Sequence, residues 1–366
     1  MTSAVSLLLP SELLLRGPLP RTLTLGLLAP MSGVMGVAGP SIINCAVLAA
    51  EEVCAVTDRA FELVLVDAGA APDVVAREAD LLVGSGLVEG LVGTHTSNVR
   101  AAVEALVADR VPYVFTPPHE FSRGASGSVF LGSDPNEQLR QPIAWLARHR
   151  PVERWALIGN DYVWPRQVHA AATRVLGDLG QRVVLDRLMP IGHVDAAELV
   201  SAVRRAGADA VLVSLVGRDG IEFHRGVTEL DAGQSFVRLC TALDETCLVA
   251  SGGDNSGQLF AAMPSFILQD DERHQRLIEL YVARFGLTAP LPGSYAEGCY
   301  DGVHLLAALC ASGVLGSNSA VDAAELLFSR EAASGRKGTS AIPRRPMRIA
   351  RAVGTDLEVV GGPRVR

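Results

Sequence analysis

The stretch Val88-Glu-Gly-Leu-Val-Gly-Thr-His-Thr-Ser-Asn-Val-Arg100 decides the fold, because a hydrophobic run breaks at Gly93 into hydroxyl-bearing residues and then continues as a helix. This order predicts a buried strand whose carboxyl end opens directly into an amphipathic helix. The start of such a helix presents free backbone N–H donors and the positive end of the helix dipole, which suit carboxylates, carbonyls and phosphates. Ser97 either caps this helix, its commoner role, or contacts a ligand.

The composition indicates a well-packed protein of two domains. The chain has 366 residues, of which 49% are hydrophobic and 20% charged, and this length exceeds one compact core. The net charge is −8 and Lys337 is the only lysine, which argues against a nucleic-acid surface. The six cysteines have no CxxC spacing, so neither a zinc site nor a disulfide framework is indicated. We expect no cofactor and no metal.

Residues 1–21 are rich in leucine but lack a basic leader, a small-residue cleavage site and an early lipidatable cysteine. No uninterrupted apolar run is long enough to span a bilayer. As the sequence is written, we expect a cytoplasmic protein without membrane insertion. A truncated start would instead fit a periplasmic or other extracytoplasmic location.

From about Thr22 onward, strand-like apolar runs alternate with helix-period segments, which is typical of βαβ units and parallel sheets. In the first series we predict strands at 23–29, 61–67, 88–93 and 111–116, and helices at 40–56, 72–83 and 97–109. In the second series we predict strands at 154–159, 182–188, 208–215 and 236–241, and helices at 136–148, 165–179, 196–206 and 220–230. Further helices are predicted at 270–285, 294–312 and 321–329, followed by a hairpin at 347–360.

The carboxyl ends of these strands carry most of the polar signal, and ligands of parallel α/β sheets bind beyond such ends. The loop at 29–39 has GxxGxxG spacing and not the GxGxxG of dinucleotide sites, which favours a tight loop near a ligand cleft. Asn160-Asp-Tyr-Val-Trp164 brings polar and aromatic side chains to one helix start, as small-molecule pockets do. Asp219, at another strand end, either caps a helix or contacts a ligand.

An enzyme is a weaker interpretation. Ser97, His95 and Asp161 have the residue types of a nucleophilic triad. The chain nevertheless lacks a GxSxG elbow, an HExxH motif and a Walker loop. A hydrolase that uses Ser97 and His95 therefore stays an alternative to a binding protein.

The segments 25–33, 93–97, 115–120, 158–166, 210–217 and 295–300 together resemble the type I periplasmic binding proteins. This family includes the leucine and branched-chain amino acid-binding proteins of ABC transporters. Within it, the chain most resembles the amide-sensor and urea-binding branch. It covers about residues 22–360 and implies an α/β fold of two Rossmann-like lobes with parallel-sheet cores. The N-terminal lobe would comprise 22–117 plus about 260–335, and the C-terminal lobe 130–245 plus about 345–366. Three hinge crossovers are expected near 117–129, 244–259 and 336–345.

Carried over residue by residue, the resemblance also implies ligand contacts in the cleft. They are His95, Thr96, Ser97, Phe115 and Thr116 in the first lobe, and Tyr162, Trp164, Val216 and Asp219 in the second. Ser97 and nearby N–H groups would hold a ligand oxygen, and Asp219 would accept from a ligand nitrogen. Relatives often have tyrosine at the positions of His95, Phe115 and His119, so acetamide or urea itself is not assumed.

We expect non-catalytic binding of a short amide, urea or amino acid, with hinge closure that shifts between open and closed populations. The favoured role is a cytoplasmic sensor whose protein partner resembles an antiterminator. The alternative is the substrate-binding component of an ABC transporter, whose partner is a permease. A homodimer is left open.

Overall fold

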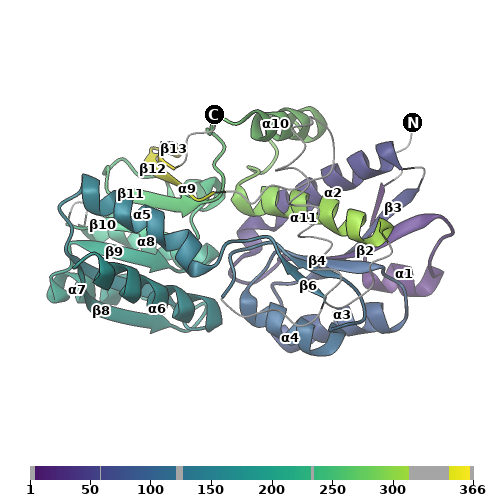
Figure 1. Ribbon diagram of the computed structural model, residues 1–366, viewed down its shortest axis with the longest axis horizontal. Coiled ribbons are helices and arrows are strands. Elements are labelled where there is room, and N and C mark those ends of the chain that lie inside the picture. The colour runs from purple at the N-terminus through teal and green to yellow at the C-terminus, as the bar shows by residue number, and fades with distance from the viewer. Residues whose placement is uncertain (1–4, 58, 121–126, 232–234, 313–345, 363–366) are drawn as a thin grey trace.

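The computed structural model describes residues 5–57, 59–120, 127–231, 235–312 and 346–362, which form two α/β lobes side by side (Figure 1). Each lobe is built on its own sheet, of six strands in the first lobe and seven in the second. The predicted α/β architecture of two lobes with parallel-rich sheets is thereby confirmed. The predicted helix at 321–329 lies outside the described residues.

The first sheet is parallel throughout and has the strand order β1-β3-β2-β4-β5-β6. Its strands are β1 (Val5–Leu8), β2 (Thr22–Ala29), β3 (Ala60–Asp67), β4 (Gly90–Gly93), β5 (Tyr113–Phe115) and β6 (Ser128–Phe130). The helices of this lobe are α1 (Pro10–Arg16), the 3-10 turn η1 (Gly36–Ala38), α2 (Gly39–Val56), α3 (Pro72–Gly84), α4 (Ser97–Val107), α10 (Glu272–Phe285) and α11 (Ser294–Ala311).

Strand β2 explains why this sheet is so apolar. All eight of its residues are buried, because helices cover both faces of the sheet. Leu25 and Leu27 pack into the cluster that contains α2 and α11, whereas Leu28 points into the cluster of α3 and α4. The alternation along one strand thus serves two separate hydrophobic layers.

The second sheet has the order β13-β12-β11-β10-β9-β7-β8 and is parallel except for β12 and β13, which are antiparallel to their neighbours. Its strands are β7 (Arg154–Asn160), β8 (Arg182–Met189), β9 (Ala210–Ser214), β10 (Val237–Cys240), β11 (Leu259–Met263), β12 (Arg348–Val353) and β13 (Asp356–Gly361). Its helices are α5 (Pro135–His149), α6 (Val163–Asp178), α7 (Ala196–Ala206), α8 (Gly217–Asp231) and α9 (Glu245–Ser251). The predicted C-terminal hairpin is β12–β13.

The first passage between the lobes lies later than the predicted 117–129. Strand β6 pairs in parallel with β5, so the chain stays in the first sheet until Phe130. It then enters α5, where the Asp134 carboxylate accepts the N–H groups of Asn136 and Glu137 at 2.7 and 3.1 Å. Glu137 in turn accepts the Asp134 N–H at 3.2 Å. This capping box fixes the direction in which the chain enters the second lobe.

The second passage also lies later than the predicted 244–259. Strand β11 pairs with β10 and β12, so residues 259–263 belong to the second sheet, and the boundary expected at about 260 is too early. The chain returns through residues 264–271 to α10 and α11, which pack on α2 (Figure 1). The third crossover, expected near 336–345, lies outside the described residues.

The N-terminal segment contributes to the first lobe. Strand β1 extends the sheet beside β3, and Leu13 of α1 is fully buried. Neither element was predicted from the sequence. By length and composition, the segment 36–56, which contains α2, resembles a membrane-crossing helix among the described helices. Its residues Ile42, Cys45 and Ala49 are fully buried in the first lobe, so it is a core helix.

We predict that Leu13→Ala destabilises the first lobe by about 2–5 kcal/mol, because it leaves a cavity where a fully buried leucine packs. Leu15→Ala is the matched control, since Leu15 lies on the same helix and is 90% exposed. Urea unfolding followed by circular dichroism measures both variants. Equal stability of the two would mean that α1 does not pack on the lobe.

Candidate ligand-binding site

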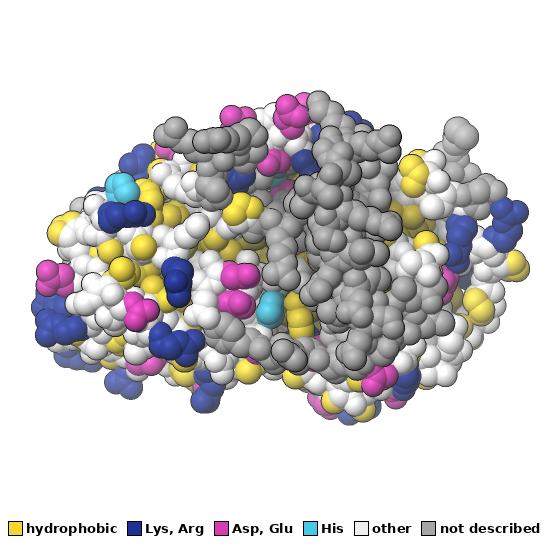
Figure 2. Space-filling model, viewed as in Figure 1, with side chains coloured by type: hydrophobic (Ala, Val, Ile, Leu, Met, Phe, Trp, Pro, Cys, Tyr) yellow, Lys and Arg dark blue, Asp and Glu magenta, His cyan; other side chains and the backbone are white. Residues whose placement is uncertain are grey.

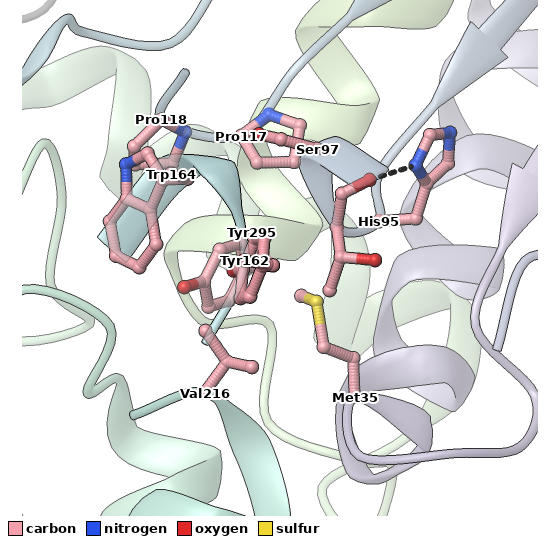
Figure 3. Close-up of a pocket in the computed structure, with 10 residues that line it drawn as sticks. Met35, His95, Ser97, Pro117, Pro118, Tyr162, Trp164, Val216 and Tyr295 are labelled. Atoms are coloured by element: carbon pink, nitrogen blue, oxygen red, sulfur yellow. Dashed lines mark hydrogen bonds between the residues drawn. The ribbon is translucent and has the colours of Figure 1, made fainter. Parts of the chain in front are cut away.

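A pocket that is partly open to solvent lies between the two lobes, at the carboxyl ends of β2, β4, β5, β7 and β9. Its lining comprises Met35, His95, Thr96, Ser97, Pro117, Pro118, Tyr162, Trp164, Val216 and Tyr295. In Figure 3, Met35, His95 and Ser97 of the first lobe face Trp164, Tyr162 and Val216 of the second. The position agrees with the rule that parallel α/β sheets bind ligands beyond their strand ends.

Six of the nine residues expected to contact ligand line this cavity. They are His95, Thr96, Ser97, Tyr162, Trp164 and Val216. The other three, Phe115, Thr116 and Asp219, are buried behind the lining. Phe115 contacts the lining residue His95, and Asp219 holds the lining residue Val216 through Asn160.

Phe115 is fully buried and is not among the residues that line the cavity. Its ring lies 5.3 Å from the His95 ring and 6.1 Å from the Phe130 ring, and the Arg100 guanidinium is 5.8 Å from its centroid. Thr116 joins the ends of two strands, because its Oγ1 lies 2.7 Å from Thr94 Oγ1. Both residues thus hold the strand ends that carry the site.

Asp219 holds the second lobe's part of the site in place. Its carboxylate accepts the Asn160 side-chain amide at 2.5 Å and the Gly192 N–H at 2.9 Å. Asn160 Oδ1 accepts the Val216 N–H at 2.9 Å. Asp219 therefore fixes Val216 through Asn160 and is not among the residues that line the pocket. Its other oxygen, Oδ1, is buried and has no hydrogen-bond partner within the described part of the chain, so acceptance from a ligand nitrogen stays a prediction.

His95 has both ring nitrogens engaged within the protein. Nδ1 lies 3.1 Å from the Thr96 carbonyl oxygen, the contact dashed in Figure 3, and Nε2 lies 2.8 Å from the Tyr113 hydroxyl. Because a carbonyl only accepts, Nδ1 carries the proton and Nε2 accepts from Tyr113. Burial lowers the pKa of His95 to about 4, so the imidazole is neutral at neutral pH.

This geometry is incompatible with the hydrolase interpretation. The acceptor nitrogen of His95 faces Tyr113 and not Ser97, so no base is available to the serine hydroxyl. Asp161, the third member of the grouping, pairs with Arg166 at 2.5 Å. The three residue types do not form a catalytic unit.

Helix α4 begins without a side-chain cap. Thr96 occupies the N-cap position and makes no capping hydrogen bond, and Ser97 is the first helical residue, so the expected capping by Ser97 is wrong. The first N–H groups of a helix have no partner within the helix. Here those donors and the Ser97 hydroxyl are at the cavity, together with the positive end of the helix dipole.

The second lobe adds a similar feature. Tyr162 is the N-cap of α6 and also makes no capping hydrogen bond. The indole N–H of Trp164 is buried and has no partner within the described part of the chain. An unsatisfied buried donor of this kind costs about 1–3 kcal/mol.

The cavity is rich in donors and poor in charge. None of its described lining residues is Asp, Glu, Lys or Arg. Burial raises the pKa values of Tyr162 and Tyr295, so both phenols stay protonated. The site therefore suits a ligand with negatively charged or neutral acceptor oxygens and an apolar body, and its lining offers no carboxylate to a ligand ammonium group.

Four lining residues were not among the predicted contacts. Met35 belongs to the glycine-rich loop at 29–39, and Pro117 and Pro118 directly follow the strand predicted at 111–116. The sequence therefore contained a signal for these three residues. Tyr295 is the second residue of α11, and its place at the cavity depends on the return of the chain to the first lobe. On the face shown in Figure 2, positive and negative side chains are scattered over the second lobe without a continuous basic patch.

The chain is similar to a known protein family and to several solved structures. Residues 22–355 match the periplasmic binding protein family. A solute-binding protein of an ABC transporter from Rhodopseudomonas palustris HaA2, in complex with p-hydroxybenzoic acid, superimposes with a TM-score of 0.75 at 17% identity, covering 94% of this chain and 98% of that one. A benzoate complex of a solute-binding protein from R. palustris gives 0.72 at 16% identity, covering 93% and 96%.

A leucine-binding protein from Thermotoga maritima MSB8 gives a TM-score of 0.75 at 16% identity, covering 93% of this chain and 98% of that one. The family match does not single out the amide-sensor and urea-binding branch. Because the family is periplasmic or extracytoplasmic, it does not support the expected cytoplasmic location. Its members bind small ligands without transforming them, which agrees with the engaged His95. The chain belongs to the periplasmic binding protein family.

Proposed function

We propose that the protein is the solute-binding component of an ABC transporter and that it captures a small carboxylic acid, with an aromatic ring as the preferred body. The observation that carries this proposal is the donor-rich, acid-free lining at the uncapped start of α4. A carboxylate accepts from several N–H and hydroxyl donors at once, and the helix dipole favours its charge. The ligands of the two R. palustris proteins have this chemistry.

The second lobe provides the apolar surface for the ring. Tyr162 and Trp164 lie with ring centroids 6.4 Å apart, and Val216 completes this side. Aromatic side chains bind flat apolar groups through offset or edge contacts. An amino acid such as leucine fits less well, because none of the described lining residues is an acid that would accept from its ammonium group.

An amide, urea or amino-acid ligand and a cytoplasmic sensor role form the second candidate. The start of α4 supports it, because the same N–H and hydroxyl donors also bind an uncharged carbonyl oxygen. Thermal-shift measurements with benzoate, leucine, acetamide and urea separate the two, since a ligand that binds only the native protein raises its melting temperature. A shift with acetamide or urea but not with benzoate favours the sensor.

We predict that Ser97→Ala weakens benzoate binding about tenfold or more, because a hydrogen bond to a charged group contributes about 1.5–3 kcal/mol. Ser85→Ala is the control, since Ser85 follows α3 and is exposed. Isothermal titration calorimetry gives the dissociation constants. Unchanged affinity of the Ser97 variant would place the ligand away from the start of α4.

The pH dependence tests the neutral state of His95. Because its pKa is about 4 in the folded protein and 6.5 is its ordinary value, the unfolded chain takes up the proton first. The stability contribution of His95 is therefore complete above pH 6.5 and is lost as the pH falls towards 4. We predict constant benzoate affinity from about pH 6 to 9, because His95, Tyr162 and Tyr295 do not change charge there. An affinity change centred near pH 6.5 would contradict this assignment.

A further inference from the structure

The glycine-rich loop at residues 31–38 is held firmly by the first lobe. Asp67 Oδ1 accepts the N–H groups of Met31, Ser32 and Gly69 at 2.8, 3.1 and 2.9 Å. A Cβ atom at Gly69 would lie 2.0 Å from the Ser32 carbonyl oxygen, so the two loops are in direct backbone contact. The loop is thus a fixed projection of the first lobe and not a loose connection.

This loop contacts the second lobe through its backbone. The Val34 carbonyl oxygen accepts the Arg218 N–H at 2.8 Å. Arg218 is the second residue of α8, and an N–H group at that position has no partner within its own helix. The Val34 carbonyl of the first lobe therefore caps the start of α8 in the second lobe. In most helices the side chain of the N-cap residue has this role.

Gly217 allows this contact. It has a φ of +50°, and a Cβ atom there would lie 2.0 Å from the Val34 carbonyl oxygen and 3.1 Å from Met35 Cα. Both neighbours are backbone atoms, so no side-chain rearrangement relieves the clash. They belong to the loop whose first residues, Met31 and Ser32, are held by Asp67. A larger residue at 217 is accommodated only when the lobes move apart.

The contact adjoins the cavity on both sides. Met35 follows Val34 and Val216 precedes Gly217, and both Met35 and Val216 line the site. Opening of the lobes separates these two residues and breaks the Val34–Arg218 hydrogen bond in one movement. Lobe closure, capping of α8 and enclosure of the ligand are therefore geometrically coupled.

We propose that the Val34 carbonyl is an interlobe latch that caps α8 in the closed protein, and that Gly217 is a positioning residue on which ligand retention depends. The role of Gly217 in ligand retention rests on the proposed function, whereas the interlobe hydrogen bond does not depend on the identity of the ligand. In the closed protein the latch protects the Arg218 amide, and its loss favours the open form.

The first experiment needs no ligand. Hydrogen exchange at the Arg218 amide is measured by NMR in the full chain and in Gly217→Ala, with Gly180→Ala as control. Gly180 has a similar φ of +71°, and a Cβ there has no heavy atom within 4 Å. We expect exchange at least about tenfold faster in Gly217→Ala and unchanged in Gly180→Ala.

Asp67→Ala tests the latch from the opposite lobe. It loosens the loop without touching α8, so an increase in Arg218 exchange in this variant cannot come from local strain at position 217. Equal exchange at Arg218 in the full chain, Gly217→Ala and Asp67→Ala would overturn the latch. A change in Gly217→Ala alone would also overturn it, since it would reduce the effect to strain within the second lobe.

Retention is then measured by stopped-flow fluorescence with benzoate as the probe. We expect Gly217→Ala to raise the dissociation rate about tenfold or more while the association rate changes little, because opening precedes release. An unchanged dissociation rate would contradict the role of Gly217 in retention. If benzoate does not bind the full chain, the proposed ligand class fails, whereas the exchange measurements still decide the latch.

Discussion

The unsatisfied N–H groups at the start of α4 are the constraint on which the rest of the site depends. Neither Thr96 nor Ser97 caps this helix, and α6 likewise begins without a side-chain cap across the cleft. Each sheet carries one of these helix starts at the carboxyl end of its strands, and residues of both line the pocket between the two lobes. Donors left open in such a place are satisfied by water or by a ligand, and a closed cleft excludes most of the water.

Polar residues near the lining hold the backbone of the two helix starts in position. His95 receives the Tyr113 hydroxyl and donates to the Thr96 carbonyl, while Asp219 holds Asn160 and through it Val216. Buried hydrogen-bond networks of this kind favour one arrangement of the backbone. His95 and Asp219 thus shape the site, and the lining itself contains Thr96, Ser97, Tyr162, Trp164 and Tyr295 as its hydrogen-bonding side chains.

Helices and strands with a strong hydrophobic periodicity were predictable from the sequence, and short elements were not. Helix α7 has the predicted bounds, because its apolar residues repeat at helical spacing. Strand β6 has three residues and no alternation to detect, so the first crossover was expected too early. In the site, the strand ends were predictable, whereas the helix α8 begins at Gly217 and turns the Asp219 carboxylate towards Asn160. Tyr295 reaches the cavity only through the return of α11, which no local pattern indicates.

Benzoate and benzamide have the same ring and differ in the charge of the group that would meet the start of α4, so their affinities test a carboxylate site there most directly. Isothermal titration calorimetry on the full chain gives both dissociation constants under one set of conditions. Binding of benzoate at least about tenfold tighter than benzamide, a difference of about 1.4 kcal/mol, is the predicted result. Equal or tighter binding of benzamide would contradict the claim that the uncapped start of α4 is a carboxylate site.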